Sequence, residues 1–111
     1  MKFRAYLKEV HFMEIVKKTE GNKATLEIRG WLDTQTAPQL QEALSELEDS
    51  ITSLVFDFAK LEYISSAGLR QVIVAYKKMM GKDGFKIINV SDEVFDIFRL
   101  TGFDQQIEIE R

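Results

Sequence analysis

The sequence has no cysteine, one histidine and one proline among its 111 residues, and no apolar run long enough to cross a bilayer. Without cysteine, a disulfide framework and thiolate chemistry are excluded. Lys2 and Arg4 are not followed by the apolar segment of a secretory signal. A formal charge of −3 disfavours sequence-independent nucleic-acid binding, which needs a basic face. These absences predict a cytoplasmic protein that contacts neither nucleic acid nor a membrane directly.

The motifs of the common catalytic classes are missing as well. A serine nucleophile needs an adjacent base, yet His11, the only histidine, lies in the N-terminal segment 1–12, and no Gly-x-Ser-x-Gly segment is present. There is no Gly-x-x-x-x-Gly-Lys phosphate loop, and no histidine and carboxylate cluster has metal-ligand spacing. The sequence therefore predicts a protein that is not an enzyme and that carries no cofactor or metal.

One domain is expected from a chain of this length, and 45% hydrophobic residues suffice to bury a core. We assign residues 13–111 to this domain and residues 1–12 to an N-terminal leader or an extra edge element. The predicted elements are strands at Met13–Thr19 and Ala24–Arg29, a helix from Thr36, a strand at Leu54–Phe58, a helix at Ser66–Met80, a strand at Phe85–Val90, a helix from Ser91, and an edge strand with Ile107 and Ile109. The order ββαβαβαβ predicts an α/β fold in which helices pack on one mixed, mostly parallel sheet.

The stretch Leu54–Arg70 contains the central strand and the start of the following helix. Its continuous apolar start suits a strand that is covered on both faces. A connection, Ala59–Tyr63, follows, and Ser65 and Ser66 then precede a helical pattern. A serine oxygen accepts a backbone N–H at a helix start, so we expect Ser66 to cap the helix at the positive end of its dipole.

The earlier helix has its own start signal. Thr36 is placed as the N-cap, Pro38 lies in the first turn, and Gln39 has the spacing of a capping box. We therefore expect the Thr36 side chain to accept a hydrogen bond from the first turn of this helix.

Polar residues follow several of the predicted strands. Parallel strands end at the same edge of a sheet, where open α/β sheets usually bind ligands and partners. That edge is expected to collect Asp33-Thr34, Asp57, Ser65-Ser66 and Asn89-Ser91. We expect the carboxylates of Asp33 and Asp57 to lie roughly 6 Å from Ser66, close enough to repel an added phosphate. Each aspartate has the alternative role of ordering its own loop through hydrogen bonds to backbone amides.

The segment Asp57-Phe58-(x)4-Tyr63-Ile64-Ser65-Ser66-Ala67-Gly68-Leu69-Arg70 resembles the signature of the STAS domain, a family named for sulphate transporters and anti-sigma factor antagonists. Gly30-Trp31-Leu32-Asp33 and Leu100-Thr101-Gly102-Phe103 support the resemblance. The sequence is similar to the stand-alone bacterial antagonists from about Met13 to Ile109. Three matches in order and at suitable separations make the signal specific.

The resemblance implies a regulator of transcription that acts by partner switching. In the antagonist family, the anti-sigma factor is an ATP-dependent kinase that phosphorylates a serine of this motif, and the matching position here is Ser66. Ser65 replaces the aspartate that commonly precedes the acceptor, which removes an acidic group and offers a second hydroxyl. Arg70 stands where many members have glycine, and it either steers a partner, holds a phosphate or is an ordinary exposed helix residue. The residues expected to bind the partner are Asp33, Thr34, Asp57, Ser65, Ser66, Gly68, Leu69 and Arg70.

Two other functions remain open from the sequence. A stand-alone STAS subunit of a membrane transporter would dock on a cytoplasmic ATPase and would need no phosphorylation. A small nucleotide- or lipid-binding domain would use the same sheet edge. Ser66 has the structural alternative of serving as a helix cap alone. The oligomeric state is not predicted.

Overall fold

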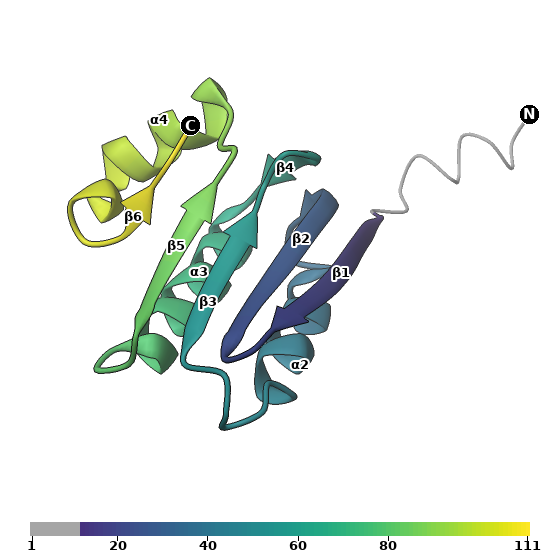
Figure 1. Ribbon diagram of the computed structural model, residues 1–111. Coiled ribbons are helices and arrows are strands. Elements are labelled where there is room, and N and C mark those ends of the chain that lie inside the picture. Colours follow the sequence, from purple (N-terminus) through teal and green to yellow (C-terminus); the bar gives the residue numbers. More distant parts are fainter. Residues whose placement is uncertain (1–11) are drawn as a thin grey trace, which may run out of the picture.

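Six strands form one mixed sheet in the computed structural model, which describes residues 12–111 (Figure 1). The strands are β1 (Met13–Glu20), β2 (Lys23–Leu32), β3 (Ser53–Asp57), β4 (Leu61–Ile64), β5 (Gly84–Ile88) and β6 (Glu108–Ile109). The helices are α2 (Ala37–Ser45), α3 (Ser66–Met79), α4 (Asp92–Thr101) and the short 3-10 helix η1 (Phe103–Gln105). Residues 1–11 of the predicted N-terminal leader, His11 included, lie outside the described residues.

The strand pairing confirms the predicted fold class. β1 and β2 form an antiparallel hairpin, and β2–β3, β3–β5 and β5–β6 are parallel pairs. The resulting order is β1-β2-β3-β5-β6. Each parallel step between β2, β3, β5 and β6 is made through a crossover that contains a helix, as parallel neighbours require.

The strand β4 was missed by the sequence prediction, which placed a connection at Ala59–Tyr63. Glu27, in the middle of β2, is the last residue to pair with β3, and Gly30–Leu32 at the end of β2 then pair with β4. β3 and β4 thus follow one another along the same edge of β2. The strand predicted at Ala24–Arg29 was also too short, because β2 continues to Leu32.

The core lies between the sheet and the helices α2 and α3, which Figure 1 shows behind the strands. The fully buried side chains come from one face of β2, β3 and β5 and from the facing sides of the helices: Leu26, Ile28, Leu32, Leu40, Leu54, Phe56, Val72, Ile87 and Phe98. Leu40 lies on α2 and Val72 on α3, so both helices contribute to this core. The core therefore fixes α3, and with it the serines at its start, against the end of the sheet.

Candidate functional site

Asp33 and Ser65 lie side by side because they follow paired strands. Leu32, the last residue of β2, pairs with Ile64, the last residue of β4. The pairing continues for one more step, since the backbone N–H of Ser65 donates to the carbonyl of Leu32 at 2.9 Å. The structure thus brings the loop after β2 and the start of α3 together at the carboxyl ends of these strands, as predicted.

The Asp33 carboxylate orders its own loop. Its Oδ1 accepts hydrogen bonds from the backbone N–H groups of Gln35 at 2.9 Å and Thr36 at 3.2 Å. Only 4% of the Asp33 surface is exposed, whereas Thr34 beside it is exposed. Asp33 therefore stabilises the conformation of this loop. Exposed residues such as Thr34 are the ones that a partner could contact directly.

Thr36 precedes α2 as predicted but does not cap it with its side chain. Its hydroxyl accepts from the Asp33 N–H at 2.9 Å and donates to the carbonyl of Trp31 at 2.6 Å. The capping box is absent because Oγ1 is committed to the Asp33 turn. The prediction missed this role, although the Asp-x-x-Thr spacing is a signal for a turn in which the two side chains serve each other's backbone.

Replacing Asp33 with alanine is expected to lower the free energy of unfolding by about 1 kcal/mol, because the N–H groups of Gln35 and Thr36 lose their buried acceptor. Asp33→Asn keeps an oxygen at that place and should stay within about 0.5 kcal/mol of the wild type. Urea unfolding of both variants measures the difference. Equal losses for alanine and asparagine would show that the negative charge, rather than the acceptor, holds the loop.

The two serines at the start of α3 have different surroundings. Ser65 is the N-cap, and its Oγ accepts from the N–H of Gly68 at 3.4 Å. Ser66 is the first residue of the helix, is exposed, and makes no side-chain hydrogen bond within the described part of the chain. The expectation that Ser66 is the cap is wrong, because Ser65 takes that position. The Ser66 hydroxyl is therefore left available to another molecule.

Gly68 sets how closely α3 approaches the sheet. It is buried in the first turn of α3, and a Cβ atom at this position would lie 2.6 Å from the carbonyl oxygen of Leu32 and 2.9 Å from Cγ1 of Ile64. No other residue fits without moving the helix or the end of β2. Leu69 next to it packs against the core. The structure thus gives both residues a packing role, and their predicted contact with a partner remains a prediction.

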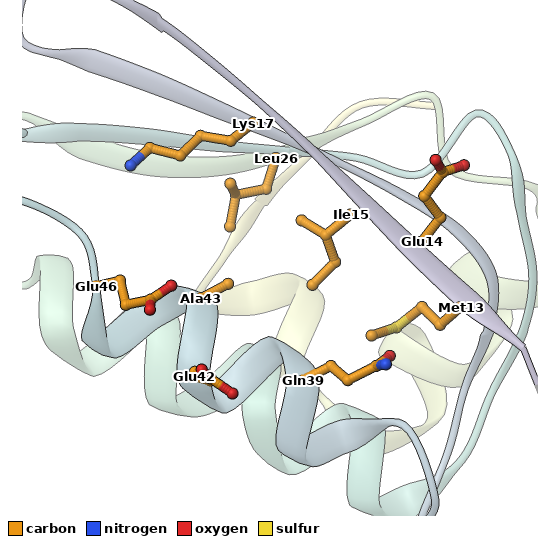
Figure 2. Close-up of a pocket in the computed structure, with 9 residues that line it drawn as sticks. All are labelled: Met13, Glu14, Ile15, Lys17, Leu26, Gln39, Glu42, Ala43 and Glu46. Carbon is orange, nitrogen blue, oxygen red and sulfur yellow. The ribbon is translucent and has the colours of Figure 1, made fainter.

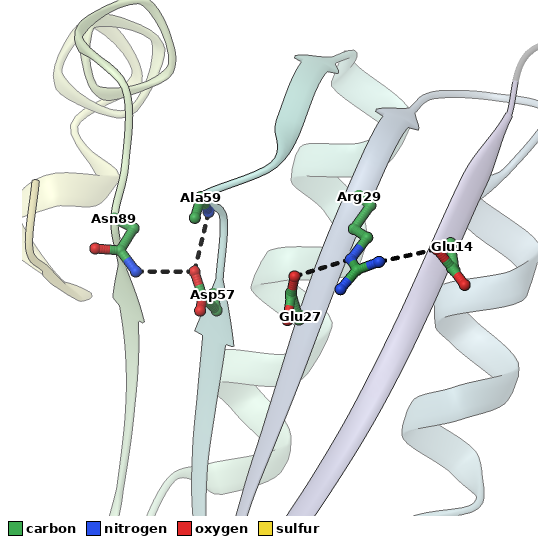
Figure 3. A network of polar contacts seen from close by, with 6 residues as sticks. All are labelled: Glu14, Glu27, Arg29, Asp57, Ala59 and Asn89. Carbon is green, nitrogen blue, oxygen red and sulfur yellow. Dashed lines mark hydrogen bonds and ion pairs between the residues drawn. The ribbon is translucent and has the colours of Figure 1, made fainter.

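Asp57 does not join Asp33 and Ser66, so the predicted convergence is wrong for this residue. Asp57 pairs in register with Glu27, five residues before Leu32 along β2, which corresponds to about 16 Å of strand. The cause is β4, which carries the chain past the end of β3 before α3 begins. Asp57 Oδ1 instead accepts from the Ala59 N–H at 2.9 Å and from Asn89 Nδ2 at 3.0 Å (Figure 3). The alternative role, a carboxylate held by a neighbouring loop amide, is the one observed.

A second polar group in Figure 3 lies on the sheet face away from α2 and α3. Arg29 Nε donates to Glu27 at 2.8 Å, and its guanidinium is 3.4 Å from Glu14. The hydrogen bond and charge of Glu27, and the nearby Glu14, raise the pKa of Arg29. Arginine is charged at physiological pH in any case, so the raised pKa does not change its charge. The Arg29–Glu14 pair is solvent-exposed, and exposed ion pairs add little stability.

A groove lies between β1 and α2 (Figure 2). It has a volume of about 470 Å³, an apolar floor that includes Ile15 and Ala43, and acidic residues such as Glu46 at its rim. None of the predicted site residues lines it. Within residues 12–111, no three histidine or acidic side chains are grouped to hold a metal ion, and no helix is long and apolar enough to cross a membrane.

Together, these features define a small α/β module that presents an exposed serine at a helix start beside a well-ordered loop. A family model described as the STAS domain matches residues 14–111, and the chain belongs to this family. The anti-sigma-B factor antagonist of Bacillus subtilis strain 168 is 33% identical over 96 residues, which span 85% of this chain and 86% of that protein.

Solved structures agree on the fold. An anti-sigma factor antagonist from Mycobacterium paratuberculosis superposes with a TM-score of 0.81 at 24% identity, over 89% of this chain and 86% of that chain. The Bacillus cell fate determinant SpoIIAA in its phosphorylated form gives a TM-score of 0.62 at 16% identity, over 86% of this chain and 90% of that chain.

Proposed function

We propose that this protein is an anti-sigma factor antagonist that is switched off by phosphorylation of Ser66. In its unmodified form it binds a cytoplasmic anti-sigma factor through the start of α3, the adjacent loop with Thr34 and the exposed face of α3. This binding frees a sigma factor for transcription. The family relationship and the antagonists among the relatives support this proposal.

The observation that carries the proposal is the contrast between the two serines. Ser65 is half-buried and holds the helix end, whereas Ser66 is exposed and its hydroxyl has no side-chain hydrogen bond within residues 12–111. A kinase needs a hydroxyl that it can reach without unfolding the substrate. Ser66 meets that condition, and the existence of a phosphorylated form of SpoIIAA, a protein of the same fold, supports the proposal.

The covalent step transfers the γ-phosphoryl group of ATP from the partner kinase to Ser66 Oγ. A P–O bond forms at Oγ, the bond between the γ-phosphorus and the bridging oxygen breaks, ADP leaves, and the hydroxyl proton passes to a base of the kinase or to solvent. The product carries about −1.5 to −2 charges at the first residue of α3.

Electrostatics then favour release of the partner. Within the domain, the positive end of the α3 dipole stabilises a phosphate at Ser66. Asp57 contributes almost nothing, because its separation along the sheet exceeds the Debye length of about 8 Å in physiological salt. The main penalty falls on the complex, where the partner surface would have to desolvate the phosphate without a matching cation.

Co-purification from the native organism, followed by calorimetry with the captured protein, tests the proposal. We expect the unmodified protein to capture an anti-sigma factor that carries a kinase domain and to bind it directly. Capture of a transport ATPase in its place, with no binding to the anti-sigma factor, would contradict the proposal and favour a transporter subunit. Stabilisation by a free nucleotide or lipid alone would point to the ligand-binding alternative.

A further inference from the structure

The outer face of α3 carries a line of exposed residues that begins at Ser66. Arg70, Val74 and Lys78 follow at intervals of four residues, and all are exposed. Residues four apart lie on the same side of an α-helix, so this stripe runs from the first to the last turn of α3. It places a guanidinium one turn from the Ser66 hydroxyl.

Arg70 has no ion-pair partner among residues 12–111. The helix α3 contains no aspartate or glutamate, and its charged residues are Arg70, Lys77 and Lys78. The ion pairs of the described residues involve Arg29, Lys86, Arg99 and Arg111, and none involves Arg70. A fully charged side chain with five donors therefore stands beside the position that we propose for modification.

The chemistry of the two groups is complementary. The planar guanidinium donates two parallel N–H bonds to a phosphate, which a lysine ammonium cannot do. Cβ atoms at this spacing are about 5–6 Å apart, well within the reach of a phosphoserine and an arginine that extend along the helix.

We propose that Arg70 binds the phosphate of phosphorylated Ser66 and so forms an ion pair along α3 that exists only in the modified protein. This inference rests on the proposed function only in so far as Ser66 is the modified residue. Its consequence is that phosphorylation changes the stripe twice: it adds an anion at Ser66 and withdraws the Arg70 guanidinium from contact with a partner.

The test uses the full chain with phosphoserine incorporated at position 66 during translation, so that no kinase is involved. Phosphorus NMR then follows the second ionisation of the phosphate in the wild type, in Arg70→Gln and in Lys77→Gln. Lys77 is a matched control, because its substitution removes the same charge from the same helix at about 16 Å from Ser66 along the helix axis. Asp33 after β2 and Glu62 in β4 are unchanged in all three proteins, so their effects cancel in the comparison.

A guanidinium that pairs with the phosphate favours its dianion and lowers its titration midpoint. We expect Arg70→Gln to raise the midpoint by ~0.3 pH units and Lys77→Gln to leave it unchanged. Equal midpoints in Arg70→Gln and Lys77→Gln would overturn the proposed pair. Since no partner takes part, a shift confined to Arg70→Gln would support the pair even if the anti-sigma factor proved not to phosphorylate Ser66.

Discussion

Gly68→Ala is expected to lower the free energy of unfolding by about 2 kcal/mol. An alanine in a helix interior normally stabilises by about 1 kcal/mol relative to glycine. Here the added Cβ would lie 2.6 Å from the carbonyl oxygen of Leu32 and 2.8 Å from Cγ of the same residue. The carbonyl belongs to the end of β2 and cannot rotate away as a side chain can. α3 must therefore move out from the sheet, and urea unfolding measures the loss.

Gly21→Ala is a control that shows the cost of backbone strain without steric crowding. Gly21 has a φ of +61°, and a Cβ added there would have no atom within 4 Å, so alanine costs only the left-handed conformation, about 1 kcal/mol. The Gly68 variant should be the less stable of the two, although its helical backbone suits alanine. A Gly68→Ala protein as stable as the wild type would show that α3 is not held against the end of β2 as described.

Phosphoserine at position 66 is expected to weaken binding to the anti-sigma factor by at least about 100-fold, equivalent to about 2.7 kcal/mol. The phosphate lies on the surface that we propose for docking, and burying it without a cation of the partner costs more than the interface regains. Ser66→Asp places a smaller charge there and should weaken binding in the same direction. Isothermal titration calorimetry of the three proteins gives the ratio directly.

Ser50→Asp is a matched control for this charge. Ser50 is exposed in the connection between α2 and β3, so the same substitution adds the same charge away from the start of α3. Its affinity should equal that of the wild type. Equal affinities for Ser50→Asp, Ser66→Asp and the phosphoserine protein would mean that the partner does not bind at Ser66.

The sequence predicted the fold class because local patterns indicate most of the elements. The buried strands β3 and β5 are short apolar runs, and the stripes of α2 and α3 repeat at helical spacing. β4 was missed because only its two end residues, Leu61 and Ile64, are buried, and Glu62 and Tyr63 between them are exposed. Its pairing with the end of β2 is a tertiary contact that no local pattern encodes.

The same missing strand explains why the predicted position of Asp57 was wrong, whereas the two helix caps were wrong for local reasons. The sequence predicted that Asp33 and the serines lie close together, because each of the two segments follows a strand of the parallel part of the sheet. The position of Asp57 was not predicted correctly, since four unrecognised strand residues separate it from Ser66 along the sheet. Ser65 is the cap because the first residue of α3 is Ser66, which the two adjacent serines alone do not reveal. Thr36 does not make its expected capping bond, because its hydroxyl bonds to the backbone of Asp33 and Trp31.

The central claim is that Ser66, and not Ser65, accepts a phosphoryl group. Incubation with the cognate anti-sigma factor and Mg-ATP, followed by intact-mass measurement, tests it most directly. We expect one added phosphoryl group on the wild type and on Ser65→Ala, and none on Ser66→Ala. Modification that survives in Ser66→Ala but disappears in Ser65→Ala, or a wild type that stays unmodified, would contradict it.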